Sequence, residues 1–412
     1  MQNPADFKLE AANGGAPGHD LRDPGTHGLS GTGRTAPQRK NRYTFIRVLI
    51  ALAMLALGLG ATELLARDEE HPAAGVMQKA AQRMARAEHA VAEKRRSLGI
   101  TIDPALDPYR TGLIGVETNM LTTTIGDIVA KRTTTNTAFA ALVVRYFYEL
   151  GLRPGDRIAV GSSGSFPGIL LAVLSACAET GVEPVVITSI GASEYGANIE
   201  GLSNAEMMAA CREAGVLPYM PAAISPGADG DQGISSLYRL EPSDDIARYA
   251  RSAASALKVP FVGGDGFDAS FSSHLDVYEK AGPIKAFVNI GGADVNFGSD
   301  PASLRLKPGL ILPSARKSGV EPDGSGGARG SANSSEIQPP GGLLGYYLAR
   351  GTPVLHFLNI KGLALQGGIP VDGDPEAPIP SEILHRRKKP AWTLVLGLLL
   401  AGAALAIRKP LG

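Results

Sequence analysis

Serine and glycine gather directly after a short apolar run that is typical of a β-strand. Residues 161–168 read GSSGSFPG and follow the run RIAV at 157–160. A turn of this kind between a strand and a helix exposes backbone N–H groups, and the helix dipole adds a field that favours anions. A tight turn that needs glycine only for its backbone geometry is the alternative. The residues of the predicted phosphate or carboxylate site are Ser162, Ser163, Gly164 and Ser165.

Similar residues follow two further predicted strands. Ser193 comes after the run at 184–188, and Asn289, Gly291 and Gly292 stand where the run 284–290 ends. Ligands of an open parallel sheet bind beyond the carboxyl ends of its strands. We therefore expect these residues to meet the first loop at one edge of the sheet, which favours a ligand site over isolated tight turns.

Two adjacent cations stand in a threonine-rich segment. The segment 112–136 contains Lys131 and Arg132. Both residues are predicted to bind the carboxylates of a ligand. The alternative is a solvated helix face with Thr and Asn side chains as local caps.

A serine nucleophile lacks the usual supporting motif. The G-x-S-x-G elbow needs glycine on both sides of the nucleophile, but Ser163 has Gly161 before it and Ser165 after it. Ser163 or Ser165 with His356 is the weak catalytic candidate that is left. His356 lies in an apolar run, where a buried structural histidine is the simpler interpretation, and His274 is predicted to be exposed on a helix.

Composition and missing motifs exclude several classes of function. The chain has 412 residues, with 40 basic and 40 acidic side chains and a net charge of zero, so bulk charge does not favour nucleic acid as a partner. We find no metal-binding spacing, no phosphate-binding P-loop and no dinucleotide fingerprint, and we predict neither a metal nor a cofactor. Two cysteines, Cys177 and Cys211, are predicted to be buried thiols, with a disulfide as the alternative.

The order of the elements predicts an α/β fold. Short apolar runs alternate with helical stretches between residues 100 and 380. This alternation predicts a doubly wound, mostly parallel sheet of five or six strands, the runs at 219–224 and 260–262 included. Residues 318–338 are rich in glycine and serine, and we expect an exposed flexible insertion there.

Apolar segments near both ends predict a transmembrane helix at each end. Residues 45–66 and 391–407 are the two predicted spans, with a cleavable signal peptide and a buried core helix as the respective alternatives. Residues 1–44 are predicted to be a disordered tail, and 67–99 a membrane-proximal helix. The prediction is a two-pass protein of the bacterial inner (cytoplasmic) membrane, with its α/β domain outside the cytoplasm.

Several long sequence blocks resemble the bacterial poly-gamma-glutamate system protein family. They are GVETNMLTTTIGDIVAKRTTTN (115–136), GDRIAVGSSGSFPG (155–168), ITSIGASEYGANI (187–199), IKAFVNIGGAD (284–294) and PVLHFLNIKGLA (353–364). The resemblance covers roughly residues 100–370. It implies a part in making or exporting poly-γ-glutamate, and it assigns no catalytic residues.

Three functions follow as hypotheses. The first is a membrane-anchored accessory protein that binds poly-γ-glutamate, a polyanion, or a synthase or export partner. The second is a serine-dependent amide hydrolase or transferase that acts on this polymer through Ser163 or Ser165. The third is a cytoplasm-facing enzyme for a small phosphorylated metabolite.

Overall fold

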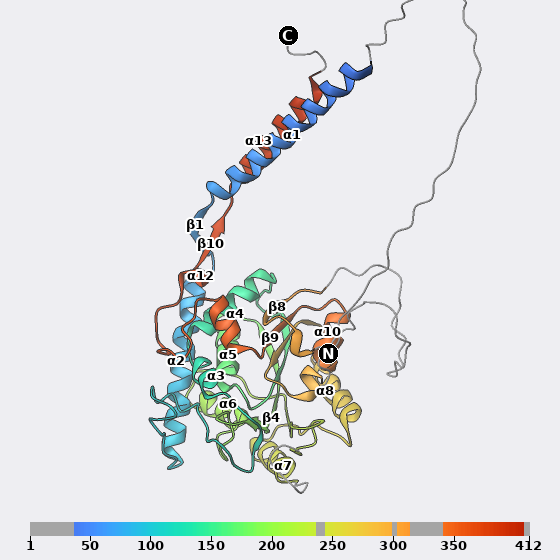
Figure 1. The fold of residues 1–412 in the computed structure, drawn as a ribbon. Helices are drawn as coiled ribbons and strands as arrows, with labels where there is room; N and C mark the ends of the chain where they lie inside the picture. The colour runs from blue at the N-terminus through green and yellow to red at the C-terminus, as the bar shows by residue number, and fades with distance from the viewer. Residues whose placement is uncertain (1–36, 236–243, 299–302, 314–340, 408–412) are drawn as a thin grey trace, which may run out of the picture. The chain divides into compact units, whose positions relative to one another are not determined.

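The computed structural model in Figure 1 describes residues 37–235, 244–298, 303–313 and 341–407. The chain divides into two compact units, Arg67–Lys388 and the two terminal segments together. The predicted insertion at 318–338 lies outside the described residues, as does the predicted tail up to residue 36. The last part of that tail is helical instead, because α1 begins at Pro37.

The terminal unit is a pair of helices, α1 (Pro37–Leu64) and α13 (Ala391–Ala406), which lie side by side in Figure 1. The pair is antiparallel, since the Oγ1 atoms of Thr62 and Thr393 are 2.7 Å apart and Arg47 bonds to the carbonyl of Ala404. Within the described residues, Arg42–Leu64 is the one helix long and apolar enough to cross a membrane. At 16 residues, α13 falls below that length, so the predicted second span is not established.

The unit Arg67–Lys388 is an α/β unit, and its elements follow here in chain order. They are β1 (Arg67–Glu70), α2 (Ala74–Ser97), β2 (Thr122–Thr124), α3 (Ile128–Thr133), α4 (Ala138–Glu149), β3 (Arg157–Ser162), α5 (Pro167–Thr180), β4 (Glu183–Ser189), β5 (Ala192–Ser193), α6 (Asn204–Glu213), β6 (Ala223–Ser225), α7 (Asp245–Leu257), α8 (Phe267–Ala281), β7 (Ile284–Ile290), α9 (Asp294–Phe297), a 3-10 helix (Ser303–Arg305), β8 (Gly309–Ile311), α10 (Gly342–Ala349), β9 (Val354–Phe357), α11 (Ile360–Gln366), α12 (Ser381–Leu384) and β10 (His385–Lys388).

The main sheet has six strands in the order β6-β4-β3-β7-β9-β8, and only β8 is antiparallel to its neighbour. This confirms the predicted mostly parallel α/β sheet. The predicted strand 260–262 forms only a single bridge, between Phe261 and Ile224, because Pro260 has no N–H to donate and the chain turns at Gly263. The sixth strand is β8, a short segment that sequence analysis does not predict.

Helices cover both faces of this sheet. Ile158 and Val160 in β3 pack into a cluster with α2, α4 and α5, whereas Ala159 between them packs with residues of α8 and α10. Neighbouring side chains of a strand point to opposite faces, so this alternation places the two helix layers on either side. The sheet is therefore doubly wound.

Helix α2 belongs to the α/β unit. Its residues Met77, Met84 and Val91 are fully buried in the core shared with α4 and α5. These residues form one apolar stripe on an otherwise charged helix. The compact unit consequently begins at Arg67, earlier than the predicted domain boundary at residue 100.

Candidate functional site

A cavity of about 430 Å³ lies at the carboxyl edge of the main sheet. Ser163 and Ser165 line it from the loop after β3, and Gly292 lines it from the loop after β7. The chain runs from β3 outward to β4 and β6, then returns to the other side of β3 with β7. The cavity therefore lies at the point where the strand order reverses, which is the usual ligand position in a doubly wound sheet.

Backbone and side-chain hydrogen bonds hold the loop after β3 in place. The Ser163 N–H donates to the carbonyl of Ile290 in β7, and the Gly164 N–H donates to the carbonyl of Gly191. Asn204 at the start of α6 donates through its Nδ2 to the carbonyl of Ser163 at 2.9 Å and to Ser162 Oγ at 3.2 Å. Ser162 and Gly164 thus support the loop.

The approach of the two loops requires glycine at position 291. Gly291 has a φ of 81°, in the left-handed region. A Cβ atom there would overlap Ser163 Oγ. Asn289 lies behind this turn, where its Nδ2 donates to the carbonyl of Gly291 at 2.9 Å.

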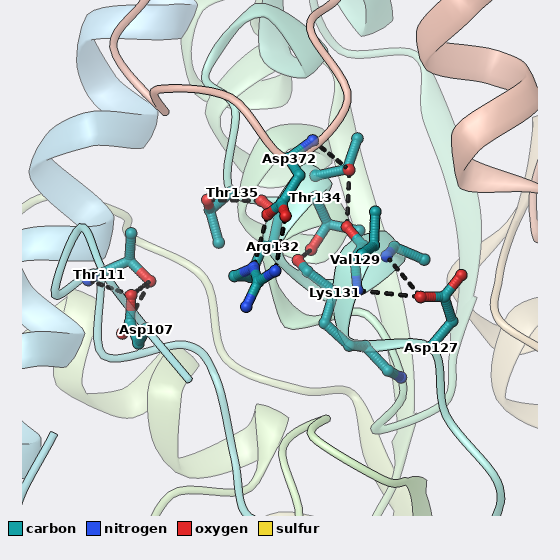
Figure 2. Close-up of polar contacts among 11 residues, drawn as sticks. Asp107, Thr111, Asp127, Val129, Lys131, Arg132, Thr134, Thr135 and Asp372 are labelled. Atoms are coloured by element: carbon teal, nitrogen blue, oxygen red, sulfur yellow. Dashed lines mark hydrogen bonds and ion pairs between the residues drawn. The ribbon is translucent and has the colours of Figure 1, made fainter. Parts of the chain in front are cut away.

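Lys131 brings an amine into the cavity from α3. Asp127 caps this helix by accepting from the Val129 N–H at 2.9 Å, as Figure 2 shows. The Lys131 side chain is buried, and its Nζ donates to Ser193 Oγ and to the carbonyl of Ser165. The Phe166 ring centroid lies 4.4 Å from the same Nζ.

Burial lowers the pKa of Lys131 to about 7. The carboxylates of Asp127 and Glu194 act in the opposite direction, because a nearby negative charge stabilises the ammonium form. Both the ammonium and the free amine are therefore populated near neutral pH.

Arg132 has a different environment. Its Nη2 donates to Asp372 Oδ2 at 2.6 Å, its Nε bonds to the other oxygen of that carboxylate, and this ion pair raises the pKa of the guanidinium. Figure 2 shows the side chains of Lys131 and Arg132 leaving α3 in different directions. Arg132 thus joins α3 to the segment around Asp372, away from the cavity lining.

Carboxylates also line the cavity. Asp127 Oδ2 lies 2.5 Å from Lys361 Nζ, and this pairing lowers the pKa of Asp127. Asp294 and Asp229 line another part of the wall, and Asp294 Oδ2 accepts from the Gly230 N–H at 2.8 Å. Burial raises the pKa of Asp294. The cavity therefore contains both a cationic group and carboxylates.

His274 and His356 are both buried in the α/β unit. His356 is buried, 3.0 Å from Asn289 Nδ2 through its Nδ1, and its ring stacks on Phe297. No hydrogen bond in the described part of the chain joins His356 to Ser163 or Ser165. The predicted exposure of His274 is wrong: its side chain is 1% exposed, because α8 turns this face onto the Ser225–Asp231 loop, and His274 Nε2 lies 3.8 Å from Asp231 Oδ2.

The predicted ligand residues divide into two sets. The residues that line the cavity are Lys131, Ser163, Ser165, Ser193 and Gly292. The residues that lie behind it or beside it are Arg132, Ser162, Gly164, Asn289 and Gly291.

Some lining residues escape sequence analysis. Ser189, at the end of β4, is buried, and its Oγ has no hydrogen-bond partner among the described residues although it borders the cavity. Such an unsatisfied hydroxyl is available to a ligand. The sequence signal that could have identified Ser189 is its position at the end of a predicted strand. Asp294 and Lys361 likewise stand shortly after predicted strands.

In the part of the chain that the structure describes, neither a metal-binding cluster nor a disulfide lies at the site. Among the described residues, no group of three or more His, Cys, Asp or Glu side chains is arranged to hold a metal ion. Cys177 and Cys211 are buried free thiols, as predicted from their helices.

A scan of protein-family models, a search of curated proteins and a search of solved structures find no match to this chain. The fold defines an α/β protein with a cavity at the point where the strand order reverses.

Proposed function

We propose that this protein is a membrane-anchored accessory protein of poly-γ-glutamate biosynthesis or export, and that its cavity binds the polymer. The observation that carries the proposal is the Lys131 amine, held at the cavity wall against the Ser193 hydroxyl, in a cavity that Ser163 also lines. Ammonium and hydroxyl groups are the donors that carboxylates accept. The sequence blocks that resemble the poly-gamma-glutamate system family contribute most of these residues, which supports this choice of carboxylate ligand.

The carboxylates of the cavity favour one part of the polymer. A γ-linked glutamate chain has a free α-ammonium next to an α-carboxylate only at its amino end. Lys131 provides a partner for the carboxylate. Asp294, in the part of the wall that also contains Asp229, provides one for the ammonium. We therefore assign the cavity to the amino-terminal glutamyl unit, whose two charges match the two kinds of group.

The membrane anchor is the second part of the proposal. Large apolar side chains of α1 are exposed in the terminal unit, among them Phe45, Leu57 and Leu59. Exposed apolar side chains on a long helix suit a lipid environment. We propose that α13, packed antiparallel on α1, completes a two-pass hairpin with both chain termini in the cytoplasm and the α/β unit outside. Reporter fusions to the C-terminus test this topology: activity of a cytoplasm-dependent reporter is expected, and activity only of a periplasm-dependent reporter contradicts it.

Equilibrium binding tests the ligand. The full chain in detergent is titrated with poly-γ-glutamate of defined length, and with the same polymer acetylated at its amino end. Lys131→Met is expected to weaken binding at least tenfold, since one charge-assisted contact in a buried site is worth more than about 1.4 kcal/mol. Lys280→Met, at an exposed lysine of α8, is the matched control and should bind within twofold of the wild type.

The outcomes separate the two parts of the binding proposal. Equal affinity of the wild type and a folded Lys131→Met variant contradicts the cavity as the polymer site. Equal affinity for the free and the acetylated polymer contradicts the assignment to the amino end. Thermal melting of each variant shows whether it is folded.

A serine-dependent hydrolase or transferase is the second candidate function. The contact between Lys131 and Ser193 favours it specifically, because it pairs a hydroxyl with an amine whose pKa is lowered to about 7. The original candidates, Ser163 or Ser165 with His356, have no such contact in the described residues.

A further inference from the structure

Four serines line the cavity, and hydrogen bonds link three of them, whose hydroxyls have different surroundings. Ser163 Oγ accepts from the Ser165 N–H at 3.2 Å, and Ser165 Oγ accepts from the Ser193 N–H at 3.2 Å. Ser193 Oγ instead contacts the Nζ of Lys131. Among the described residues, Ser193 is the serine of this group whose hydroxyl contacts a side-chain base.

The second contact of Lys131 orients its amine. In the ammonium form, Nζ donates to both Ser193 Oγ and the carbonyl of Ser165. In the free-amine form, one N–H still donates to the Ser165 carbonyl, which accepts only, and the lone pair is left to accept the proton of Ser193. A hydroxyl paired with an oriented, desolvated amine is the arrangement of serine–lysine acyl transferases and hydrolases.

We infer that Ser193 and Lys131 form a nucleophile–base pair that cleaves or transfers an acyl group bound in the cavity. Only the identity of the acyl substrate, an amide of the polymer, rests on the proposed function. The pair itself follows from the contact of the two side chains at the cavity wall.

The reaction balances without a cofactor. The Ser193 hydroxyl proton passes to the Lys131 lone pair while Oγ bonds to the carbonyl carbon of the substrate. The carbon–nitrogen bond then breaks, and Lys131 returns the proton to the leaving nitrogen, which leaves an ester on Ser193. Water, deprotonated by Lys131, attacks this ester, the carbon–Oγ bond breaks, and Oγ regains a proton. An amine acceptor in place of water gives transfer.

Other charged groups face the pair and set its pH dependence. Asp127, at the start of α3, and Glu194, next to Ser193, raise the pKa of Lys131. Lys361, Asp229 and Asp294 border the same cavity from three other segments. Burial of the amine outweighs the first two carboxylates, so its pKa is about 7. Reactivity of Ser193 should therefore rise with pH through this value.

A fluorophosphonate probe tests the pair without using the polymer. The serine oxygen displaces fluoride from phosphorus, so a phosphorus–oxygen bond replaces the phosphorus–fluorine bond and the serine proton passes to the base. The full chain in detergent is treated with the probe at several pH values, and the modified residue is identified by mass spectrometry. We expect modification at Ser193, with a rate that rises through about pH 7.

Variants separate the pair from ordinary surface reactivity. Ser193→Ala should abolish the modification, and Lys131→Met should slow it at least about 100-fold, the usual contribution of a general base. Lys131→Arg, which keeps a cation but has no free amine at neutral pH, should also be slow. If the positive charge alone were responsible, Lys131→Arg would react as fast as the wild type. Ser252→Ala, at an exposed serine of α7, is the control and should react like the wild type.

Three results would overturn the inference: no modification at Ser193, modification at Ser163 or Ser165 instead, or a rate at Ser193 that is unchanged in a folded Lys131→Met variant. Polymer binding that fails while Ser193 is still labelled overturns the proposed ligand and leaves the pair standing.

Discussion

Lys131 and Arg132 are neighbours in α3, but their charged groups reach different partners: Lys131 contacts Ser193 at the cavity, and Arg132 pairs with Asp372. Adjacent helix residues point about 100° apart, so two neighbouring cations rarely serve one site. The Lys131 amine is available to a ligand, whereas the Arg132 guanidinium is neutralised within the protein.

Loss of the Arg132–Asp372 pair should affect stability and leave polymer binding unchanged. The two side chains are only 20% and 31% exposed and meet through two hydrogen bonds. We expect Arg132→Gln to lower the free energy of unfolding by about 1 kcal/mol, with Asp372→Asn similar and the double variant little worse than either. Thermal and urea unfolding of the full chain measure this. A loss of polymer affinity as large as in Lys131→Met would mean that Arg132 contacts the ligand.

Alanine at position 291 should destabilise the turn after β7, and alanine at 292 should not. Gly291 has a φ of 81°, and an added Cβ would displace Ser163 Oγ. The left-handed backbone alone costs a non-glycine residue about 1–2 kcal/mol. At Gly292 the nearest atom to an added Cβ is Leu358 Cδ1 at 3.7 Å, an ordinary contact. The melting temperature should fall in Gly291→Ala only, and equal melting temperatures of the two variants would argue against this account of the turn.

Acid should destabilise the protein partly through His356. Burial lowers its pKa from 6.5 to about 4, and Asn289 Nδ2 donates to its Nδ1, which is therefore unprotonated in the fold. Between these two pH values the unfolded chain binds a proton that the folded chain does not. Stability from this residue is complete above pH 6.5 and falls toward pH 4, by up to about 3 kcal/mol.

Comparison with His356→Asn isolates that effect. Asparagine has an acceptor near the position of Nδ1 but does not titrate. The contributions of His274 and Asp231 are the same in both proteins and cancel in the difference. The variant's unfolding free energy should therefore fall less between pH 6.5 and 4 than that of the wild type. Parallel pH profiles would show that His356 does not titrate in this way.

The helix pair of the terminal unit should depend on Gly58. A Cβ added there would lie 2.9 Å from Gly397 Cα, whereas one added at Gly60 would have no atom within 4 Å. Small residues allow two helices to approach this closely. Cysteines in place of Thr62 and Thr393 should cross-link readily, and Gly58→Leu should reduce the yield several-fold. Gly60→Leu is the control, and an equal yield in both leucine variants would contradict the packing.

Sequence patterns predict the sheet well because its signals are local. The runs that become β3, β4, β7 and β9 are apolar and short, and the first three are followed by glycine or hydroxyl residues. The loops after all four strands border the cavity, as their place at the carboxyl edge of the sheet predicts. Strands at the edge of the sheet are harder to predict from the sequence. β8 pairs through only three residues, Gly309–Ile311, so its existence depends on its neighbour β9 rather than on its own composition.

Sequence patterns do not predict the direction in which a polar side chain points or the partner that it contacts. Nothing local distinguishes Lys131 from Arg132, because the partner of each comes from a distant segment. The burial of His274 likewise depends on the loop that contains Asp231. Strand-end position indicates which residues border the cavity, and only the packed fold shows which hydroxyl meets the amine.

A structure of the full chain with a short γ-linked glutamate oligomer tests the central claim most directly. The account predicts that an α-carboxylate of the oligomer lies within hydrogen-bonding distance of Lys131 Nζ or Ser193 Oγ, with its amino end beside Asp294. An oligomer bound elsewhere while this cavity stays empty, or no bound oligomer at millimolar concentration, would contradict it.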